Sequence, residues 1–204
     1  NGPHTLADHY SLDPQASARS GGQLCATNGL RQCKASVFEG GIRVPSFIHW
    51  PMGITTFEGG ARTSYVASSL DFMATVASSL GYELPDNEAE DSHDLLPLLQ
   101  GKKANPRTVH VHNTRESAWA IRVGEWNLIE GKSGYHSRVH KNWETKRNYP
   151  ADDKDSVELY HYAKDPSQRV NLAKKFPEKV AELKKALKDA RERGFTAPRL
   201  VGSR

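Results

Sequence analysis

The chain has 204 residues, a length between one domain and two at roughly 100–200 residues per domain. Its 28 basic and 24 acidic side chains leave a net charge of +4 that is spread along the chain, which argues against a nucleic-acid partner. No apolar run approaches the roughly 20 residues of a membrane-spanning helix, which argues against a membrane protein.

The first quarter of the chain predicts a long loop followed by a buried strand. Residues 3–33 are rich in Ser, Gly, Asn and His and show no sustained period. A loop of this length is usually functional or mobile. From Ile42 to Trp50 the apolar residues suit a short buried strand of a mostly parallel sheet, with Gly40 and Gly41 permitting the bend at its start. Pro51 would end that strand.

A helix is predicted from Leu70 to Leu80. Ser68 or Ser69 suits its N-cap, and Gly81 suits its C-terminal stop. The apolar run from Leu95 to Gly101 follows an acidic stretch and marks the expected end of one layer of the fold. One face of the predicted helix carries the apolar residues that we expect in the core: Phe72, Met73, Val76 and Leu80.

The second half predicts a small unit of strands and one helix. Alternation predicts strands at residues 109–112, 119–128 and 159–162, the second of them a hairpin that turns at Gly124-Glu125. A helix is predicted from Pro177 to a stop at Gly194. Its apolar stripe consists of Val180, Leu183, Leu187 and Ala190.

Several short motifs occur in a fixed order. The chain opens on Asn1-Gly2-Pro3, Lys34 stands five residues ahead of Glu39-Gly40-Gly41, and Trp50-Pro51 follows. This order resembles the formylglycine-dependent (type I) sulfatases of the alkaline-phosphatase superfamily, whose pattern is Asp-Asn-Gly, then Lys, then Glu-Gly-Gly. The Leu-Leu-Pro-Leu-Leu run, the hairpin and the last helix also resemble the C-terminal regions of that family.

The resemblance implies an α/β fold with two parts. Residues 1–105 would be the C-terminal part of an alkaline-phosphatase-like sulfatase core, and residues 106–204 a C-terminal α+β subdomain with an antiparallel sheet and a C-terminal helix. The family carries its nucleophile in a Cys-x-Pro-Ser-Arg run, which neither Cys25 nor Cys33 matches. We therefore expect this chain to lack the nucleophile, to be inactive alone, and to partner the N-terminal portion of the same enzyme.

The resemblance also implies roles for individual residues. Taken alone, Lys34 would be a solvated lysine and Asn1 a turn residue; in the family pattern they become a sulfate-contacting cation and a calcium ligand. Calcium takes about 6–8 oxygens, so its other ligands would come from the missing N-terminal portion. The candidates for substrate binding are His4, His112, Asn113 and Arg115.

Other polar residues allow two readings each. Glu39 and Arg43 are expected to hold the glycine bend through an ion pair or backbone contacts. His110 and His112 lie on one strand face, but no third ligand stands at a recognisable spacing, so a zinc site is not expected. A basic aromatic loop suits either a sulfated sugar or no ligand at all. It contains Tyr135, His136, Arg138, His140 and Trp143.

The leading hypothesis is a calcium-dependent sulfatase that hydrolyses sulfate esters of a sulfated glycan or an aryl sulfate. A phosphodiesterase or phosphonate hydrolase of the same superfamily is one alternative, and a non-catalytic glycan-binding module is the other. The family resemblance implies a periplasmic or extracellular protein. Cys25 and Cys33 fit a local disulfide or two buried thiols equally well.

Overall fold

The computed structural model of the chain describes residues 30–32, 36–54, 61–85, 87–102, 107–114, 118–131 and 157–197. Contacts between Cα atoms group the chain into two compact units. The first contains residues 1–46 and 111–187, and the second contains residues 47–110 and 188–204. The domain boundary expected after residue 105 stays a prediction. Among the residues in these described ranges, no helix is long and apolar enough to cross a membrane.

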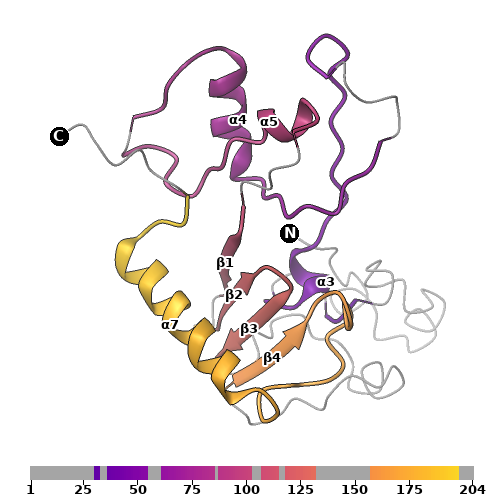
Figure 1. Ribbon diagram of the computed structural model, residues 1–204, viewed down its shortest axis with the longest axis vertical. Helices are drawn as coiled ribbons and strands as arrows, with labels where there is room; N and C mark the ends of the chain where they lie inside the picture. Colours follow the sequence, from indigo (N-terminus) through magenta and orange to yellow (C-terminus); the bar gives the residue numbers. More distant parts are fainter. Residues whose placement is uncertain are drawn as a thin grey trace, which may run out of the picture. The chain divides into compact units, whose positions relative to one another are not determined.

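The first unit is built on a four-stranded sheet with the strand order β1-β2-β3-β4 (Figure 1). The strands are β1 (Val109–Asn113), β2 (Trp119–Val123), β3 (Trp126–Glu130) and β4 (Val157–His161). Both β2 with β3 and β3 with β4 pair antiparallel. Gly124 opens the hairpin turn at φ 56°, a left-handed conformation that favours glycine. The hairpin and the strands predicted in the second half of the chain are confirmed.

One face of this sheet is covered by helix α7 (Pro177–Arg193), which runs alongside the strands (Figure 1). The ring of Trp126 on β3 lies 5.4 Å from that of Phe176 just before the helix, and Lys184 is 3.1 Å from Glu130. In α7, Leu183 and Leu187 are buried, as the predicted apolar stripe requires. On this face, which we call the α7 face, three paired strand residues are fully buried: Ile121, Leu128 and Leu159.

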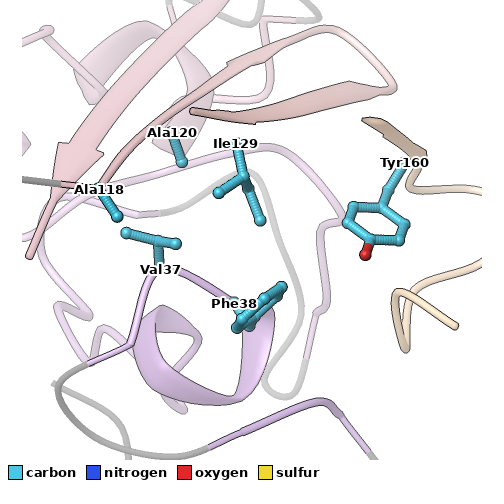
Figure 2. Packing of buried hydrophobic residues seen from close by; sticks show 6 residues of the cluster. All are labelled: Val37, Phe38, Ala118, Ala120, Ile129 and Tyr160. Carbon is cyan, nitrogen blue, oxygen red and sulfur yellow. The ribbon is translucent and has the colours of Figure 1, made fainter. Parts of the chain in front are cut away.

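The opposite face of the sheet is covered by residues from the N-terminal side of the chain. Val37 and Phe38 pack against side chains of β2, β3 and β4 in one buried cluster (Figure 2). Because neighbouring strand residues point to opposite faces, these partners alternate with those under α7. The strand-side members of the cluster are Ala118, Ala120, Ile129 and Tyr160. Both faces of the sheet are therefore buried.

The predicted strand from Ile42 to Trp50 is wrong for this structure. A short helix, α3 (Glu39–Ile42), contains both glycines, and residues 43–50 have no regular secondary structure. Residues 43–50 are exposed, with Phe47 at 92%. A buried strand needs neighbouring strands on which to pair, and the described residues supply none for this segment.

The second unit contains helices α4 (Asp71–Ser79) and α5 (Leu96–Leu99). The helix predicted at 70–80 is confirmed, and Gly81 has the left-handed φ of 69° that suits its stop. The predicted core face is wrong, because Phe72, Met73 and Leu80 are 75%, 58% and 77% exposed. Asp71 and Ala77 are the buried residues of α4.

Asp71 is the centre of a buried hydrogen-bond network. Its carboxylate accepts hydrogen bonds from the guanidinium of Arg107, with Nε at 3.1 Å, and from the backbone N–H groups of Ser68 at 2.7 Å and His93 at 2.9 Å. The predicted N-cap, Ser68 or Ser69, is wrong. Leu70 occupies the N-cap position of α4, and its side chain makes no capping hydrogen bond. Burial alone would raise the pKa of Asp71, but these hydrogen bonds outweigh it and lower the pKa below 3.8.

Candidate functional site

Lys34 itself lies outside the described residues, but the chain on each side of it is described. We call residues 30–32 and 36–43 the Lys34 flanks. Arg31, Gln32, Val37 and Phe38 have no exposed surface, and Glu39 is almost fully buried. Residues 31–32 and 36–41 of the flanks therefore belong to the interior of the first unit, whereas Arg43 at the end of the second flank is exposed.

The first flank is held by an ion pair that joins it to β4. Arg31 Nη1 donates to Glu158 Oε2 at 2.9 Å and to the Tyr160 hydroxyl at 2.8 Å. The Tyr160 hydroxyl in turn donates to Glu158. The same guanidinium lies 3.9 Å above the ring of Phe38. Burial, and then the charge of Glu158, raises the pKa of Tyr160, so the phenol keeps the proton that it donates.

Gly40 joins the two flanks to each other. Its backbone N–H donates to the Arg31 carbonyl at 2.8 Å. A Cβ atom at Gly40 would overlap the carbonyl oxygens of Arg31 and Gln32. Gly40 does not have a positive φ, so the predicted reason for the glycine, a bend at the start of a strand, is wrong. Its role is to let α3 approach the backbone of the first flank closely.

Gln32 has φ 62° although it is not a glycine. The left-handed region is uncommon for such residues and costs on the order of 1–3 kcal/mol. Gln32 is fully buried and stands two residues before Lys34. The surrounding contacts therefore hold a strained backbone next to the candidate lysine.

The second flank is anchored through Glu39. Its backbone N–H donates to Oε1 of the buried Gln168 at 2.7 Å. Burial raises the pKa of the Glu39 carboxyl above 4.5, and the charges of Arg122 and then Arg43 oppose that shift. Of the two predicted contacts between Glu39 and Arg43, the backbone one is confirmed, because Arg43 N–H donates to the Glu39 carbonyl at 2.8 Å.

Two arginine side chains meet at one tyrosine beside this flank. Arg43 donates from Nη1 to the Tyr162 hydroxyl. The Arg122 guanidinium lies 3.9 Å above the Tyr162 ring, and its Nε donates to the Gly124 carbonyl at 3.0 Å. Arg43 is thus tied to the end of β4 through Tyr162 and does not pair directly with Glu39.

His112 on β1 tethers the second flank to the sheet. Its Nε2 lies 2.9 Å from the carbonyl oxygen of Val37. A carbonyl oxygen only accepts hydrogen bonds, so Nε2 carries the proton. Burial lowers the pKa of His112 below 6.5, against the opposing effect of that hydrogen bond. Its substrate-binding role stays a prediction, while the structure shows a contact with the protein's own backbone.

The remaining predicted residues divide into described and undescribed ones. Asn113 is exposed at the end of β1, and His110 lies on the same strand face as His112. Among the residues that the structure describes, no group of three or more His, Cys, Asp or Glu side chains is placed to hold a metal. The following predicted residues lie outside the described ranges: Asn1, His4, Cys25, Cys33, Lys34, Arg115 and the loop residues 135–143.

Sequence reasoning missed the partners that hold the flanks: Arg31, Glu158, Tyr160 and Gln168. Glu158 offered one signal, because a carboxylate in an otherwise apolar strand needs a partner when that strand is buried. No local sequence pattern could identify Arg31 as the partner of Glu158, because the two residues are 127 positions apart in the chain.

No family model matches the sequence. The chain is 31% identical over 160 residues to an N-acetylgalactosamine-6-O-sulfatase of Bacteroides thetaiotaomicron, a match that covers 78% of this chain and 29% of that protein. It is 30% identical over 168 residues to arylsulfatase A of Bos taurus, covering 79% and 32%. The chain thus spans about a third of the length of the curated relatives it matches.

A solved sulfatase structure from work on glycosaminoglycan metabolism by Bacteroides thetaiotaomicron superimposes on this chain with a TM-score of 0.67. The sequence identity is 27%, and the match covers 88% of this chain and 35% of the other. The sheet and the helices described above therefore follow an arrangement found in alkaline-phosphatase-like proteins.

Proposed function

Because the chain belongs to the sulfatase family, in which it matches a C-terminal portion, we propose that it forms part of an enzyme that hydrolyses sulfate esters. Lys34 is the proposed catalytic residue. The nucleophile, a formylglycine in the proposal, would come from the N-terminal portion of the enzyme. That portion is the proposed partner, and this chain alone would be inactive.

The observation that carries the proposal is the burial and bonding of the Lys34 flanks. Sulfate-ester cleavage spreads negative charge over the sulfuryl and leaving oxygens, and a cation held in place stabilises that charge without reorganising at the moment of reaction. The Arg31–Glu158 pair anchors the first flank, and the His112–Val37 and Glu39–Gln168 hydrogen bonds anchor the second. The proposed role requires the lysine to be positioned before substrate binds, and the anchored residues 30–32 and 36–39 support it.

Calcium is the proposed cofactor, with Asn1 donating one amide oxygen. The described residues supply no cluster of metal ligands of their own, so the carboxylates that complete the site would lie in the N-terminal portion. When bound, the ion would polarise the sulfuryl oxygens of the ester.

The proposed substrate is a sulfated carbohydrate, with an aryl sulfate as a model compound. The relative from Bacteroides thetaiotaomicron, an N-acetylgalactosamine-6-O-sulfatase, supports the carbohydrate. His4, Asn113 and Arg115 are the proposed substrate contacts, and the hydrogen bond to Val37 favours a positioning role for His112. A periplasmic or extracellular location is also proposed.

The test is a substitution of Lys34 in the chain assembled with its N-terminal portion. We expect Lys34→Ala to lower turnover of a sulfated aryl ester by about 10²–10³, the usual cost of removing one such charge-stabilising group. Lys164→Ala is the matched control, because Lys164 is an exposed lysine in the turn after β4. Equal turnover in both variants would contradict the catalytic assignment.

The same preparation separates the two alternative functions. An aryl phosphodiester offered beside the sulfate ester measures phosphoryl chemistry directly. Binding of a sulfated oligosaccharide without release of sulfate would instead identify a glycan-binding module. The proposal requires the enzyme to hydrolyse the sulfate ester, with release of inorganic sulfate, much faster than it hydrolyses the phosphodiester.

A further inference from the structure

Two arginine side chains from separate segments of the first unit converge on one tyrosine, and we call Arg43, Arg122 and Tyr162 the Tyr162 cluster. Arg122 stands next to the last residue of β2, and Tyr162 directly follows β4. Because β2 and β4 both pair antiparallel with β3, they run in the same direction and end at the same edge of the sheet. Arg43 directly follows α3, which lies beside the end of β4 (Figure 1). The fold therefore gathers two cations at this edge.

The hydrogen bonds of the Tyr162 cluster leave several of its donors unused. Arg122 lies 3.9 Å above the Tyr162 ring and donates from Nε to the Gly124 carbonyl at 3.0 Å. Arg43 donates from Nη1 to the Tyr162 hydroxyl. Within the described ranges, no residue accepts a hydrogen bond from either Nη group of Arg122 or from Nη2 of Arg43. Each arginine is thus held in position while it keeps N–H groups that a ligand can use.

The cluster is accessible to solvent and carries positive charge. Arg43 is exposed, and Arg122 and Tyr162 are half-buried. Among the described residues, no carboxylate forms an ion pair with either arginine. The charges of both arginines act on the carboxyl of Glu39, which is 4% exposed and therefore turned away from solvent. An anion that arrives from solvent thus meets two cations.

The contact between Arg122 and the ring determines which ligand suits the cluster. A guanidinium that lies flat on an aromatic ring uses its face for that contact and keeps its N–H donors at its edge. Those edge donors match the oxygens of an oxyanion in a bidentate arrangement. The ring also restricts the side chain before a ligand binds, which reduces the entropy that is lost on binding. The Tyr162 cluster is therefore suited to one oxyanion, such as a sulfate group.

We propose that the Tyr162 cluster binds a sulfate group of a sulfated carbohydrate other than the sulfate ester that is hydrolysed. This inference rests on the proposed function, in which Lys34 contacts the hydrolysed ester. A sulfate ester is an anion, and arginine stays protonated in proteins, so the attraction between them does not depend on a titrating group. Binding of a group that does not react adds affinity for the substrates that carry it. The cluster would thus make the enzyme prefer carbohydrates with more than one sulfate group.

The test compares two substrates of the chain assembled with its N-terminal portion. One is an aryl sulfate with a single sulfate group, and the other is a chondroitin 6-sulfate hexasaccharide, which carries several. Arg122→Gln should lower the ratio of kcat/KM for the hexasaccharide to kcat/KM for the aryl sulfate by about 10-fold or more, because charge-assisted hydrogen bonds to the second sulfate are lost. Arg43→Gln should lower the same ratio. A loss of stability alone would lower both rates together and leave the ratio unchanged.

Arg193→Gln is the matched control. Arg193 is also an exposed arginine beside an aromatic ring, with its guanidinium 5.4 Å from the ring centre of Phe195, but it belongs to the second unit. We expect this variant to keep the ratio of the unsubstituted enzyme. An equal fall of the ratio in the Arg193 and Arg122 variants would show that the total charge of the protein, and not the Tyr162 cluster, attracts the hexasaccharide.

Calorimetry in the Lys34→Ala background measures binding apart from turnover. There, Arg122→Gln should weaken binding of the sulfated hexasaccharide about 10-fold or more, and should not change the weak binding of the desulfated hexasaccharide, which keeps its carboxylates. The inference would be overturned by an unchanged affinity for the sulfated form, by an equal loss for both forms, or by no binding of the sulfated form before substitution. An enzyme that shows the expected binding but releases no sulfate would keep this site and contradict the proposed function. Sulfate release with an unchanged ratio in the Arg122 variant would do the reverse.

Discussion

In the first unit, both faces of the sheet are covered, and the Lys34 flanks fill one of them with Val37 and Phe38. In the second unit, the apolar residues of α4 are exposed, and the side chains buried most completely include the charged pair Asp71 and Arg107. The first unit closes its own hydrophobic core. The second contains a buried ion pair and leaves Phe72, Met73 and Leu80 exposed. The difference is in what each unit buries: an apolar cluster between the sheet and the flanks in the first, and a charged pair beside a few apolar side chains in the second.

The largest expected effect is the loss of one member of a buried ion pair. Arg31→Met should lower the free energy of unfolding by about 3–5 kcal/mol, because Glu158 would be left as an uncompensated buried charge. Arg107→Met should do the same through Asp71. Urea denaturation followed by tryptophan fluorescence measures both.

The two variants should differ in where the damage appears. We expect Arg31→Met to speed amide hydrogen exchange in residues 36–41 and Arg107→Met to speed it in residues 68–79. Lys188→Met is the control, because its pair with Glu192 is mostly exposed and worth about 0–1 kcal/mol. Identical exchange patterns in the two arginine variants would contradict the conclusion that each ion pair stabilises its own unit.

Gly40→Ala tests the close approach of α3 to the first flank. The added Cβ would overlap two backbone carbonyl oxygens, which have little room to move. We expect a loss of about 3 kcal/mol in the free energy of unfolding. Gly194→Ala should cost only about 1–2 kcal/mol, because its cost is the left-handed φ of 80° in open space. A smaller loss for Gly40→Ala than for Gly194→Ala would show that the flanks are not tightly packed.

His112→Gln tests the hydrogen bond that ties Val37 of the second flank to β1. Because the folded pKa of His112 lies below 6.5, the folded state binds fewer protons than the unfolded state just below that pH. Its contribution to stability is therefore present above pH 6.5 and is lost as the pH falls from 6.5 toward the folded pKa. We expect His112→Gln to remove this part of the pH dependence and to cost about 1–3 kcal/mol at pH 7.5. An unchanged difference in stability between pH 7.5 and 5.5 would contradict the assignment.

The two buried carboxylates should respond to pH in opposite directions. The lowered pKa of Asp71 gives a contribution that is present above pH 3.8 and is lost as the pH falls below it. The raised pKa of Glu39 means that the folded state binds the proton more tightly, so stability decreases as the pH rises from 4.5 through the folded pKa. Glu39→Gln should flatten the stability profile above pH 4.5, and Asp71→Asn should flatten it below pH 3.8. Denaturation series across pH 3 to 7 measure both slopes.

Local features of this protein were predictable from the sequence. The Gly124-Glu125 hairpin, the buried stripe of α7 and the glycine stops at Gly81 and Gly194 follow from backbone conformation and periodicity over a few residues. The motif around Lys34 also indicates the sulfatase family without reference to the fold. These signals are local, so the sequence around each one is enough to determine it.

Only the tertiary structure shows which surfaces are buried and why position 40 requires a glycine. The apolar stretch 42–50 looked like a buried strand, but no described strand pairs with it, and α4 buries Asp71 instead of Phe72. Gly40 is needed for a close approach to Arg31 and not for a bend, and Arg31 finds its partner 127 residues away. Burial depends on which distant segments come together, and that pairing is a property of the folded chain that no local pattern contains.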